Sequence, residues 1–365
     1  MAVGVCLPFR LTGPGPMERR SPAHPAPGNY TIHGANVTME WDNPSIGRAV
    51  HAVLDYFGFS CRDESPSAPH VRMRLLDRGR SPGIPKSVVL IALYNGVEIW
   101  KSADHFYLRD GDSIVEVHPA SGTARGVLRT SPWLRPNIIR MESITLIIHG
   151  VLLLLRRRAF YPLHAAAVTN GDYGVLFVAE SDGGKSTLAL SLVMQGWKYL
   201  SDDSILLRPN VSYVEALPLR RDFGLDEEAV RYVPAMARHW RPFFTDERKR
   251  RVDMASLFPG QAANSSTPRL LVFPRIVNEG ESRLTPIGRM DALSLLMQQS
   301  SLLALEPGVT TAHLDVLGRL VRQAISYQLT AGRDLRDDPA LLPHLLARII
   351  PAVTTPTVTV TPASA

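Results

Sequence analysis

The clearest pattern of apolar and polar positions lies between residues 174 and 206. Residues 175–179 read VLFVA, a short apolar run typical of a buried strand. From Ser186 onward apolar residues recur at helical spacing, until Gly196 stands where a glycine commonly follows a helix end. Residues 198–201 predict a second strand. The pattern therefore predicts a strand, a glycine-bearing loop, a helix and another strand, in that order.

Residues 29–135 predict a smaller domain ahead of this stretch. Residues 30–40 and 71–75 alternate as strands do, and residues 46–57 have the spacing of an amphipathic helix. Asn95-Gly96 and Asp110-Gly111 each separate two β-rich runs, which indicates hairpins. We expect an α+β domain built as an antiparallel meander with one helix. Residues 1–28 are rich in proline and glycine, so disorder is expected there, with Met17 an alternative start to Met1.

Residues 136–350 predict the second, larger domain. Residues 144–155 are apolar but too few to span a bilayer, so they favour a buried helix; the three arginines that follow, 156–158, indicate a solvated helix end. A strand is expected from His164 to Thr169, then a hairpin near residue 210, a strand at 269–276 and several amphipathic helices. Residues 325–332 fit a late strand, and residues 339–350 a last helix. The tail, residues 351–365, is of low complexity and expected to be disordered.

The loop between the first strand and the helix carries the candidate chemistry. A loop that turns into a helix N-terminus aims backbone N–H groups at one point and adds about half a positive charge. Lys185 would reach the β- and γ-phosphates of a nucleotide, and the Ser186 hydroxyl would ligate Mg²⁺. A plain helix cap is the alternative. The predicted nucleotide-binding residues are Ser181, Asp182, Gly183, Gly184, Lys185, Ser186 and Thr187.

Two acids, Asp202 and Asp203, end the second predicted strand. Paired carboxylates beside a phosphate-binding loop can hold a metal ion and accept a proton from an attacking hydroxyl, whereas an ordinary solvated turn is the alternative. We predict Ser186 and Asp202 as metal ligands and both acids as catalytic. The sequence does not separate the base from its neighbour.

These motifs together resemble the catalytic domain of HPr kinase/phosphorylase and the HPr-kinase-like serine kinases, and more distantly the ATP-dependent phosphoenolpyruvate carboxykinases. That family has a histidine on a preceding strand, a GxSGxGKS[TE] loop and an Asp-Asp pair. Here His164 lies 21 residues before Lys185, and the two acids lie 17 and 18 residues after it.

This resemblance implies an α/β P-loop kinase domain that uses ATP and Mg²⁺ to phosphorylate a serine of a small protein or peptide. It also implies that His164 lies near the transferred phosphate and orients the acceptor hydroxyl or an acid. Some members of the family act on ribosomally made precursor peptides such as lasso peptides, and we take such a peptide as the preferred substrate class.

The loop departs from the family pattern at two glycine positions, now Ala179 and Asp182. A carboxylate about 5 Å from a phosphate costs on the order of 3 kcal/mol at an effective dielectric constant of 20. Asp182 must therefore point outward, bind Mg²⁺ or weaken nucleotide binding, although aspartate tolerates the left-handed backbone such a loop needs. A non-catalytic nucleotide-sensing or scaffold module is the alternative function. The glycine-rich signature that follows the acids in the family is missing, so phosphatase activity is not expected.

The amino-acid composition indicates which classes of ligand and partner the protein is expected to bind. The chain has 365 residues and a formal net charge of +6, with acids and bases interspersed, which favours nucleotide ligands over nucleic acid. Its only two cysteines are too few for a disulfide framework and favour the cytoplasm. His105 and His118 are expected to be surface or packing histidines, and homo-oligomer formation is left open. The candidate cations for the transferring phosphate are Arg220, Lys249, Arg251 and Arg275.

Overall fold

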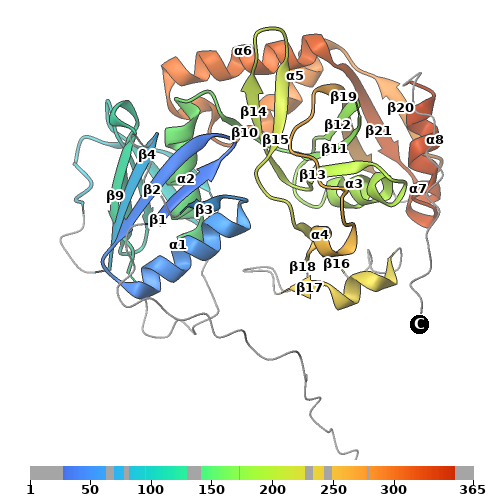
Figure 1. Ribbon diagram of the computed structural model, residues 1–365. Coiled ribbons are helices and arrows are strands. Elements are labelled where there is room, and N and C mark those ends of the chain that lie inside the picture. The colour runs from blue at the N-terminus through green and yellow to red at the C-terminus, as the bar shows by residue number, and fades with distance from the viewer. Residues whose placement is uncertain are drawn as a thin grey trace, which may run out of the picture.

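The computed structural model describes residues 28–62, 70–77, 82–94, 96–129, 141–171, 173–226, 233–241, 249–277 and 280–349. The described residues form a mixed α/β protein with four sheets. The N-terminal sheet lies on the left of Figure 1, and the sheet that carries the glycine-bearing loop lies on the right. The two expected disordered ends lie outside the described residues, except that Gly28 already begins a strand. Asn95 of the first expected hairpin also lies outside them.

The first sheet contains nine strands and mixes antiparallel with parallel pairs. In spatial order they are β3 (Ser60–Arg62), β1 (Gly28–Ile32), β2 (Ala35–Trp41), β4 (Val71–Leu76), β9 (Thr123–Val127), β8 (Ser113–His118), β7 (Phe106–Asp110), β6 (Val97–Lys101) and β5 (Val89–Tyr94). Strands β5 to β9 form the predicted antiparallel meander, and both expected hairpins are present.

The prediction of a purely antiparallel sheet is wrong at β4, which pairs in parallel with both β2 and β9. A helix and the β3 segment intervene between β2 and β4, and a crossover of this kind brings the next strand back in the same direction. Residues 30–40, expected as one strand, form the two strands β1 and β2. Their turn is made by His33 and Gly34, which both have positive φ angles (48° and 86°), as a tight hairpin requires.

Two helices supply most of the apolar cover of this sheet, α1 (Pro44–Tyr56) and α2 (Met141–Arg156). The side chain of Asn43 caps α1 by accepting a hydrogen bond from the Ser45 amide. Helix α2 packs against β4, β7 and β8, so its apolar run is buried as predicted, but in the core of the first sheet.

Arg156 corrects the prediction of a solvated arginine triplet. Its side chain is only 1% exposed, and its guanidinium donates a hydrogen bond to the Leu303 carbonyl (3.2 Å). Burial lowers the pKa of Arg156 to about 10. The sequence reading failed because the end of α2 is covered by the 3-10 turn Leu303–Leu305, which lies far away in the chain. Arg157 next to it pairs with Glu306 instead.

The second sheet contains six strands with a parallel centre. In spatial order they are β13 (Lys198–Ser201), β11 (Ala166–Asn170), β12 (Tyr173–Phe177), β19 (Pro268–Ile276), β21 (Ile325–Ala331) and β20 (Arg283–Pro286). One face packs against α3 (Lys185–Met194), α7 (Arg333–Asp337) and α8 (Leu341–Ala347). The other face packs against α5 (Arg289–Gln298) and α6 (Pro307–Gln323). The strands and helices expected along this half of the chain are therefore present.

Two three-stranded sheets and a short helix complete the described part. They are β10 (Tyr161–His164), β14 (Ser204–Pro209) and β15 (Val214–Pro218), then β16 (Phe223–Asp226), β18 (Lys249–Val252) and β17 (Trp240–Arg241), with α4 (Met254–Leu257) and the 3-10 turns Pro119–Ser121 and Pro234–Arg238. His164 ends β10 instead of beginning a strand, because Ala165 breaks the pairing before β11. None of the described helices has the length and apolar character needed to cross a lipid bilayer.

Two buried histidines, His149 and His313, should make the folded protein less stable in mild acid. Burial lowers the pKa of His149 on α2 to about 4, and burial together with Arg156 lowers the pKa of His313 on α6 to about 3. As the pH falls below 6.5, these histidines become protonated in the unfolded chain but stay neutral in the folded protein, which favours unfolding. At about pH 4.5 we expect each histidine to reduce the free energy of unfolding by roughly 2 to 3 kcal/mol, with no effect above pH 7.

Urea unfolding between about pH 7.5 and pH 4.5 measures this. A His313→Phe variant keeps a ring beside Tyr161, with which His313 stacks at 4.8 Å, and removes one of the titrations. It should show a shallower fall in stability than the parent. An equal fall in both proteins would contradict the assignment.

Candidate active site

The loop between β12 and α3 has the tight form that its glycines predict. Gly184 precedes α3 with a φ angle of 82°, and a Cβ atom there would lie 2.7 Å from Ile276 Cδ1. A Cβ atom on Gly183 would lie 2.7 Å from Ala179 Cβ and 3.0 Å from the Glu180 carbonyl. The Gly183 amide donates to that carbonyl (3.1 Å), which closes the turn. Space therefore favours glycine at 183, whereas the left-handed φ angle favours it at 184, and the loop leads directly into the N-terminus of α3.

Asp182 adopts a left-handed conformation in this loop, with a φ angle of 62°. A glycine would adopt it freely, and aspartate is one of the few other residues that tolerate it. The substitution that departs from the family pattern therefore preserves the backbone path. Its effect on a bound phosphate is electrostatic, because the residue lines the cavity described below.

Lys185, the first residue of α3, is only 4% exposed and is bound by the loop itself. Its ammonium group donates to the carbonyls of Ala179 (2.9 Å) and Glu180 (2.7 Å) and contacts His164 Nε2 (2.9 Å). Both carbonyls belong to the loop that precedes α3, so the loop backbone holds the charge in place. An incoming phosphate would meet an ammonium group that is already positioned.

His164 joins the loop lysine to the second acid. An ammonium group can only donate, so the 2.9 Å contact makes Nε2 the acceptor and places the ring proton on Nδ1. Nδ1 then faces Asp203 Oδ1 at 3.3 Å. Burial lowers the pKa of His164, and Asp203 only partly offsets this. A neutral imidazole thus connects Lys185 to Asp203, and the expected proximity of these residues is found.

The two acids have different environments. Asp202 is 1% exposed, and its oxygens accept from Arg220 Nη2 (2.8 Å), the Gly224 amide (2.7 Å) and the Ser186 hydroxyl (3.0 Å). The Asp203 side chain is 31% exposed and accepts from the Ser204 hydroxyl (3.0 Å). The first acid is saturated by protein donors, and the second faces solvent.

Cations keep Asp203 ionised. Burial by itself would raise the pKa of Asp203, but Arg220, His164 and Lys185 outweigh it and bring the pKa to about 2. The Arg220 guanidinium lies 3.5 Å from this carboxylate as well as next to Asp202. Burial by itself would lower the pKa of Arg220, but Asp202, Tyr56 and Asp203 outweigh it and raise the pKa well above its usual value.

Two of the four cations that the sequence suggested for the transferring phosphate pair with carboxylates of the protein. Arg220 also donates to the Tyr56 hydroxyl (2.7 Å), and Arg251 pairs with Asp222 and lies over the Tyr56 ring (4.8 Å to the centroid). Lys249 lies in β18, but its side chain is outside the described set. Arg275 is exposed and lines a second hollow, which also includes Ser181 and Asp182 of the loop. The structure shows two of the four as carboxylate partners.

The loop and the second acid face one cavity of about 290 Å³. Its lining consists of Ser181, Asp182, Gly184, Lys185, Ser186, Thr187, Asp203, Gly224, Leu225 and Asp226. Six of the seven residues predicted to bind nucleotide thus share one space with Asp203, whereas Gly183, Asp202 and His164 are not part of the lining. Gly224, Leu225 and Asp226 were missed, since nothing in their local sequence marks them. Tyr56 was missed as well, because it ends α1 and lies 164 residues before Arg220 in the chain.

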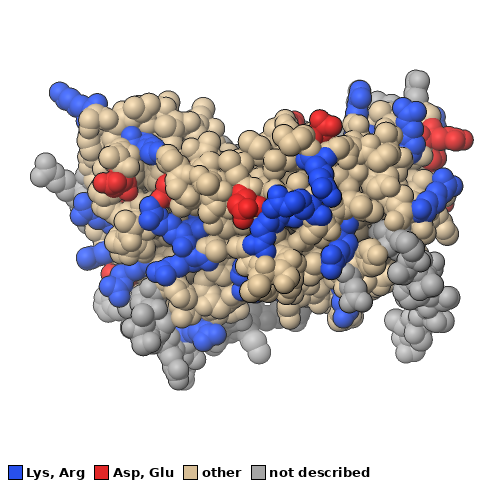
Figure 2. All heavy atoms as spheres, turned by 90° about the horizontal axis from the view of Figure 1, so that it is seen from above, with Lys and Arg blue, Asp and Glu red and all other residues tan. Residues whose placement is uncertain are grey.

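Charged side chains of both signs lie on the surface. On the face shown in Figure 2, lysine and arginine side chains form several separate groups with acidic residues among them.

Comparison with known proteins gives little beyond this geometry. No protein-family profile matches the chain, and no curated protein does. The chain is similar to the solved structure of the Hpr(Ser) kinase/phosphatase from Coxiella burnetii, at 15% sequence identity and a TM-score of 0.27. That match covers 52% of this chain and 99% of the other. With so weak a likeness, the function has to be argued from the residues of the cavity.

Proposed function

We propose that this protein is an ATP-dependent kinase that transfers the γ-phosphoryl group to a serine hydroxyl of a peptide or small protein. The observation that carries the proposal is the shared cavity, in which a glycine loop at a helix N-terminus and its lysine face an ionised carboxylate. Loop amides and Lys185 would hold the phosphates. Asp203 would receive the acceptor.

The residues present fit a magnesium ion. The Ser186 hydroxyl lines the cavity and offers an oxygen of the kind that Mg²⁺ prefers, and its 3.0 Å hydrogen bond to Asp202 fixes it in place. When bound, Mg²⁺ neutralises charge on the phosphates. Asp202 keeps its own position through Arg220 and the Gly224 amide, so the serine hydroxyl does not depend on the ion for its orientation.

Asp203 is the acid we assign as base. It is the one of the two that lines the cavity, and it is ionised at neutral pH, so it can accept a hydrogen bond from a serine hydroxyl. His164 would orient this carboxylate through its Nδ1–H. The Arg220 guanidinium contacts both carboxylates, Asp202 at 2.8 Å and Asp203 at 3.5 Å. Asp202, which protein donors already saturate, would anchor Ser186, and we assign it this role in place of the predicted direct contact with the metal.

The acceptor class follows from the sequence resemblance. The loop, the acid pair and the histidine match the HPr-kinase-like serine kinases in spacing, and that family phosphorylates serine in proteins and peptides. A precursor peptide such as a lasso peptide is our preferred acceptor. Arg220 and Tyr56 join the first domain to the site, so that domain is positioned to contribute to binding the acceptor.

An assay of phosphoryl transfer tests the proposal. Purified full-length protein would be incubated with γ-labelled ATP, Mg²⁺ and an array of serine-bearing peptides, each beside its alanine counterpart. We expect label on some serine peptides and none on their alanine partners. ATP binding measured by calorimetry, with no transfer to any peptide or to water, would instead support the nucleotide-sensing or scaffold module that Asp182 favours.

A further inference from the structure

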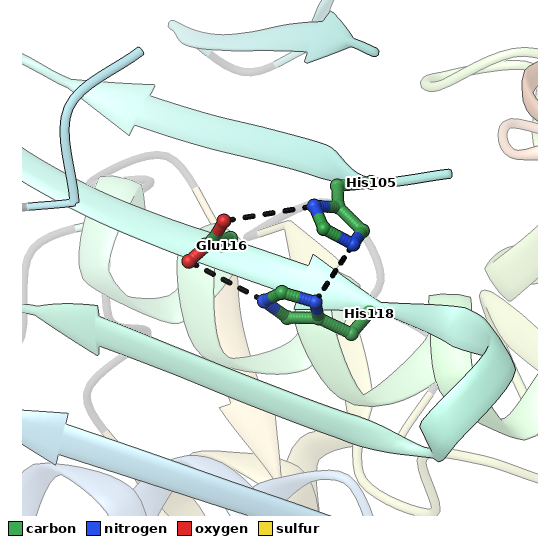
Figure 3. A group of neighbouring side chains, drawn as sticks. All are labelled: His105, Glu116 and His118. Atoms are coloured by element: carbon green, nitrogen blue, oxygen red, sulfur yellow. Dashed lines mark hydrogen bonds and ion pairs between the residues drawn. The ribbon is translucent and has the colours of Figure 1, made fainter. Parts of the chain in front are cut away.

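A second cluster of polar side chains lies on the first sheet, away from the loop. His105 immediately precedes β7, and Glu116 and His118 lie on β8. Phe106 pairs with Val117, so continuing the register by one residue places His105 opposite His118. Residues of one parity share a face of a sheet, and both histidines and the glutamate therefore point to the same side. Figure 3 shows the three side chains closing a ring across the hairpin.

The ring is held by short contacts. His118 Nδ1 lies 3.0 Å from His105 Nε2. The nitrogens on the opposite side of each imidazole face the carboxylate, with His118 Nε2 3.3 Å from one oxygen and His105 Nδ1 3.7 Å from the other. One ligand atom from each residue can be chosen so that all three lie within 4.8 Å of one another. Sequence reading treated the histidines as separate residues and missed this proximity.

We propose that His105 and His118 bind a divalent transition-metal ion of the zinc class, with Glu116 orienting both imidazoles. The positions of the N–H protons on the two imidazoles determine which nitrogens can bind the ion. A metal-bound neutral imidazole carries its proton on the other nitrogen, and that N–H usually donates to a carboxylate. If His105 Nε2 and His118 Nδ1 bind the ion, both remaining N–H groups face Glu116 oxygens. The opposite choice would set two N–H groups against each other at 3.0 Å.

The distances and the surroundings agree with this assignment. Tetrahedral zinc ligands at about 2.0–2.1 Å from the ion lie about 3.4 Å apart, so the two nitrogens need to separate only slightly from 3.0 Å. Glu116 is held by the Tyr107 hydroxyl (3.1 Å) and by Arg125 Nε (2.7 Å), which fixes its orientation. The His105 and His118 side chains are 38% and 24% exposed, so an ion can reach them and water can complete its coordination. Imidazole suits zinc, copper and nickel, and does not suit Mg²⁺.

Titration calorimetry with ZnCl₂ and, separately, MgCl₂ tests the proposal on the full-length protein. We expect Zn²⁺ binding that His105→Ala and His118→Ala each weaken by at least about tenfold, and Glu116→Gln by about 10- to 100-fold. His344→Ala removes an exposed histidine of α8 and is the matched control, which should bind as the parent does. Thermal unfolding of each variant shows whether its fold is kept. Zinc affinity unchanged in the two ligand variants would overturn the proposal.

Histidine modification gives a second measurement on the unaltered protein. Diethyl pyrocarbonate acylates accessible imidazoles, and mass spectrometry of the digested protein locates the modified residues. Zn²⁺ should protect His105 and His118 while His344 remains reactive. Equal modification of all three with and without Zn²⁺ would contradict the site. Neither measurement involves ATP or the phosphate loop, so the outcome is independent of the kinase proposal.

Discussion

Replacing Lys185 with methionine should lower the rate of ATP consumption by roughly 10²–10³-fold. The ammonium group is held by two loop carbonyls and His164, where an incoming phosphate would meet it. Methionine keeps an unbranched apolar stem of similar length and removes only the charge and its donors. The loss should appear both in the affinity for ATP and in the turnover number, because the lysine contacts phosphate before and during transfer.

The measurement is a coupled assay of ADP release together with calorimetric binding of ATP. Lys198→Met is the matched control, since Lys198 is exposed on β13 and does not line the cavity. Thermal unfolding of both variants separates a lost phosphate contact from a collapsed loop. If the Lys185 variant binds and consumes ATP as the parent does, the loop does not hold a nucleotide and the kinase proposal fails with it.

The shape of the glycine-bearing loop before α3 was predictable because its determinants are local. Gly183 and Gly184 lie where a tight turn needs them, Lys185 begins the helix, and Gly196 follows its end with a φ angle of 88°. Each of these features follows from conformational preference and periodicity within about twenty residues. The strands β12 and β13 on either side were found for the same reason.

The difference between Asp202 and Asp203 was not predictable, because long-range contacts create it. Arg220 and Gly224, which saturate Asp202, lie 18 and 22 residues further along the chain. Tyr56, whose ring hydroxyl accepts a hydrogen bond from Arg220, ends α1 and lies 164 residues away in the chain. The sequence alone shows two adjacent acids at a strand end. Only the folded arrangement buries one of them and leaves the other facing the cavity.

The difference between local signals and long-range contacts also explains why the pairing of β4 in the first sheet was predicted wrongly. Strands β5 to β9 are joined by short turns, so each strand pairs with the next and the meander could be read from the sequence. Strand β4 pairs with two strands that are far from it in the chain, and no local signal specifies either partner or their parallel direction. The cluster at Glu116 lies on β7 and β8, one of the predictable hairpins, but no motif marks it, because the strand register brings its two histidines together.

Exchanging Asp203 for asparagine should lower phosphoryl transfer by about 10²–10⁴-fold and leave the affinity for ATP nearly unchanged. The substitution keeps the shape of the side chain and removes the only carboxylate of the acid pair that lines the cavity. Stability should change little at neutral pH beyond the loss of an ion pair with Arg220 (3.5 Å). Single-turnover transfer to a serine peptide, with ATP binding measured separately, distinguishes a lost base from lost binding.

The matched change, Asp202→Asn, should act mainly on stability. It removes one charge from the buried contact with Arg220 (2.8 Å), and breaking a pair of this kind costs about 3–5 kcal/mol. Asparagine also places an amide either where both the Ser186 hydroxyl and the Gly224 amide need an acceptor or against the Arg220 guanidinium. Urea unfolding should therefore show a large loss for the Asp202 variant and a small one for the Asp203 variant. Equal losses of stability, or equal rates of transfer, would mean that the two carboxylates share one role, and the assignment of Asp203 as the base would be wrong.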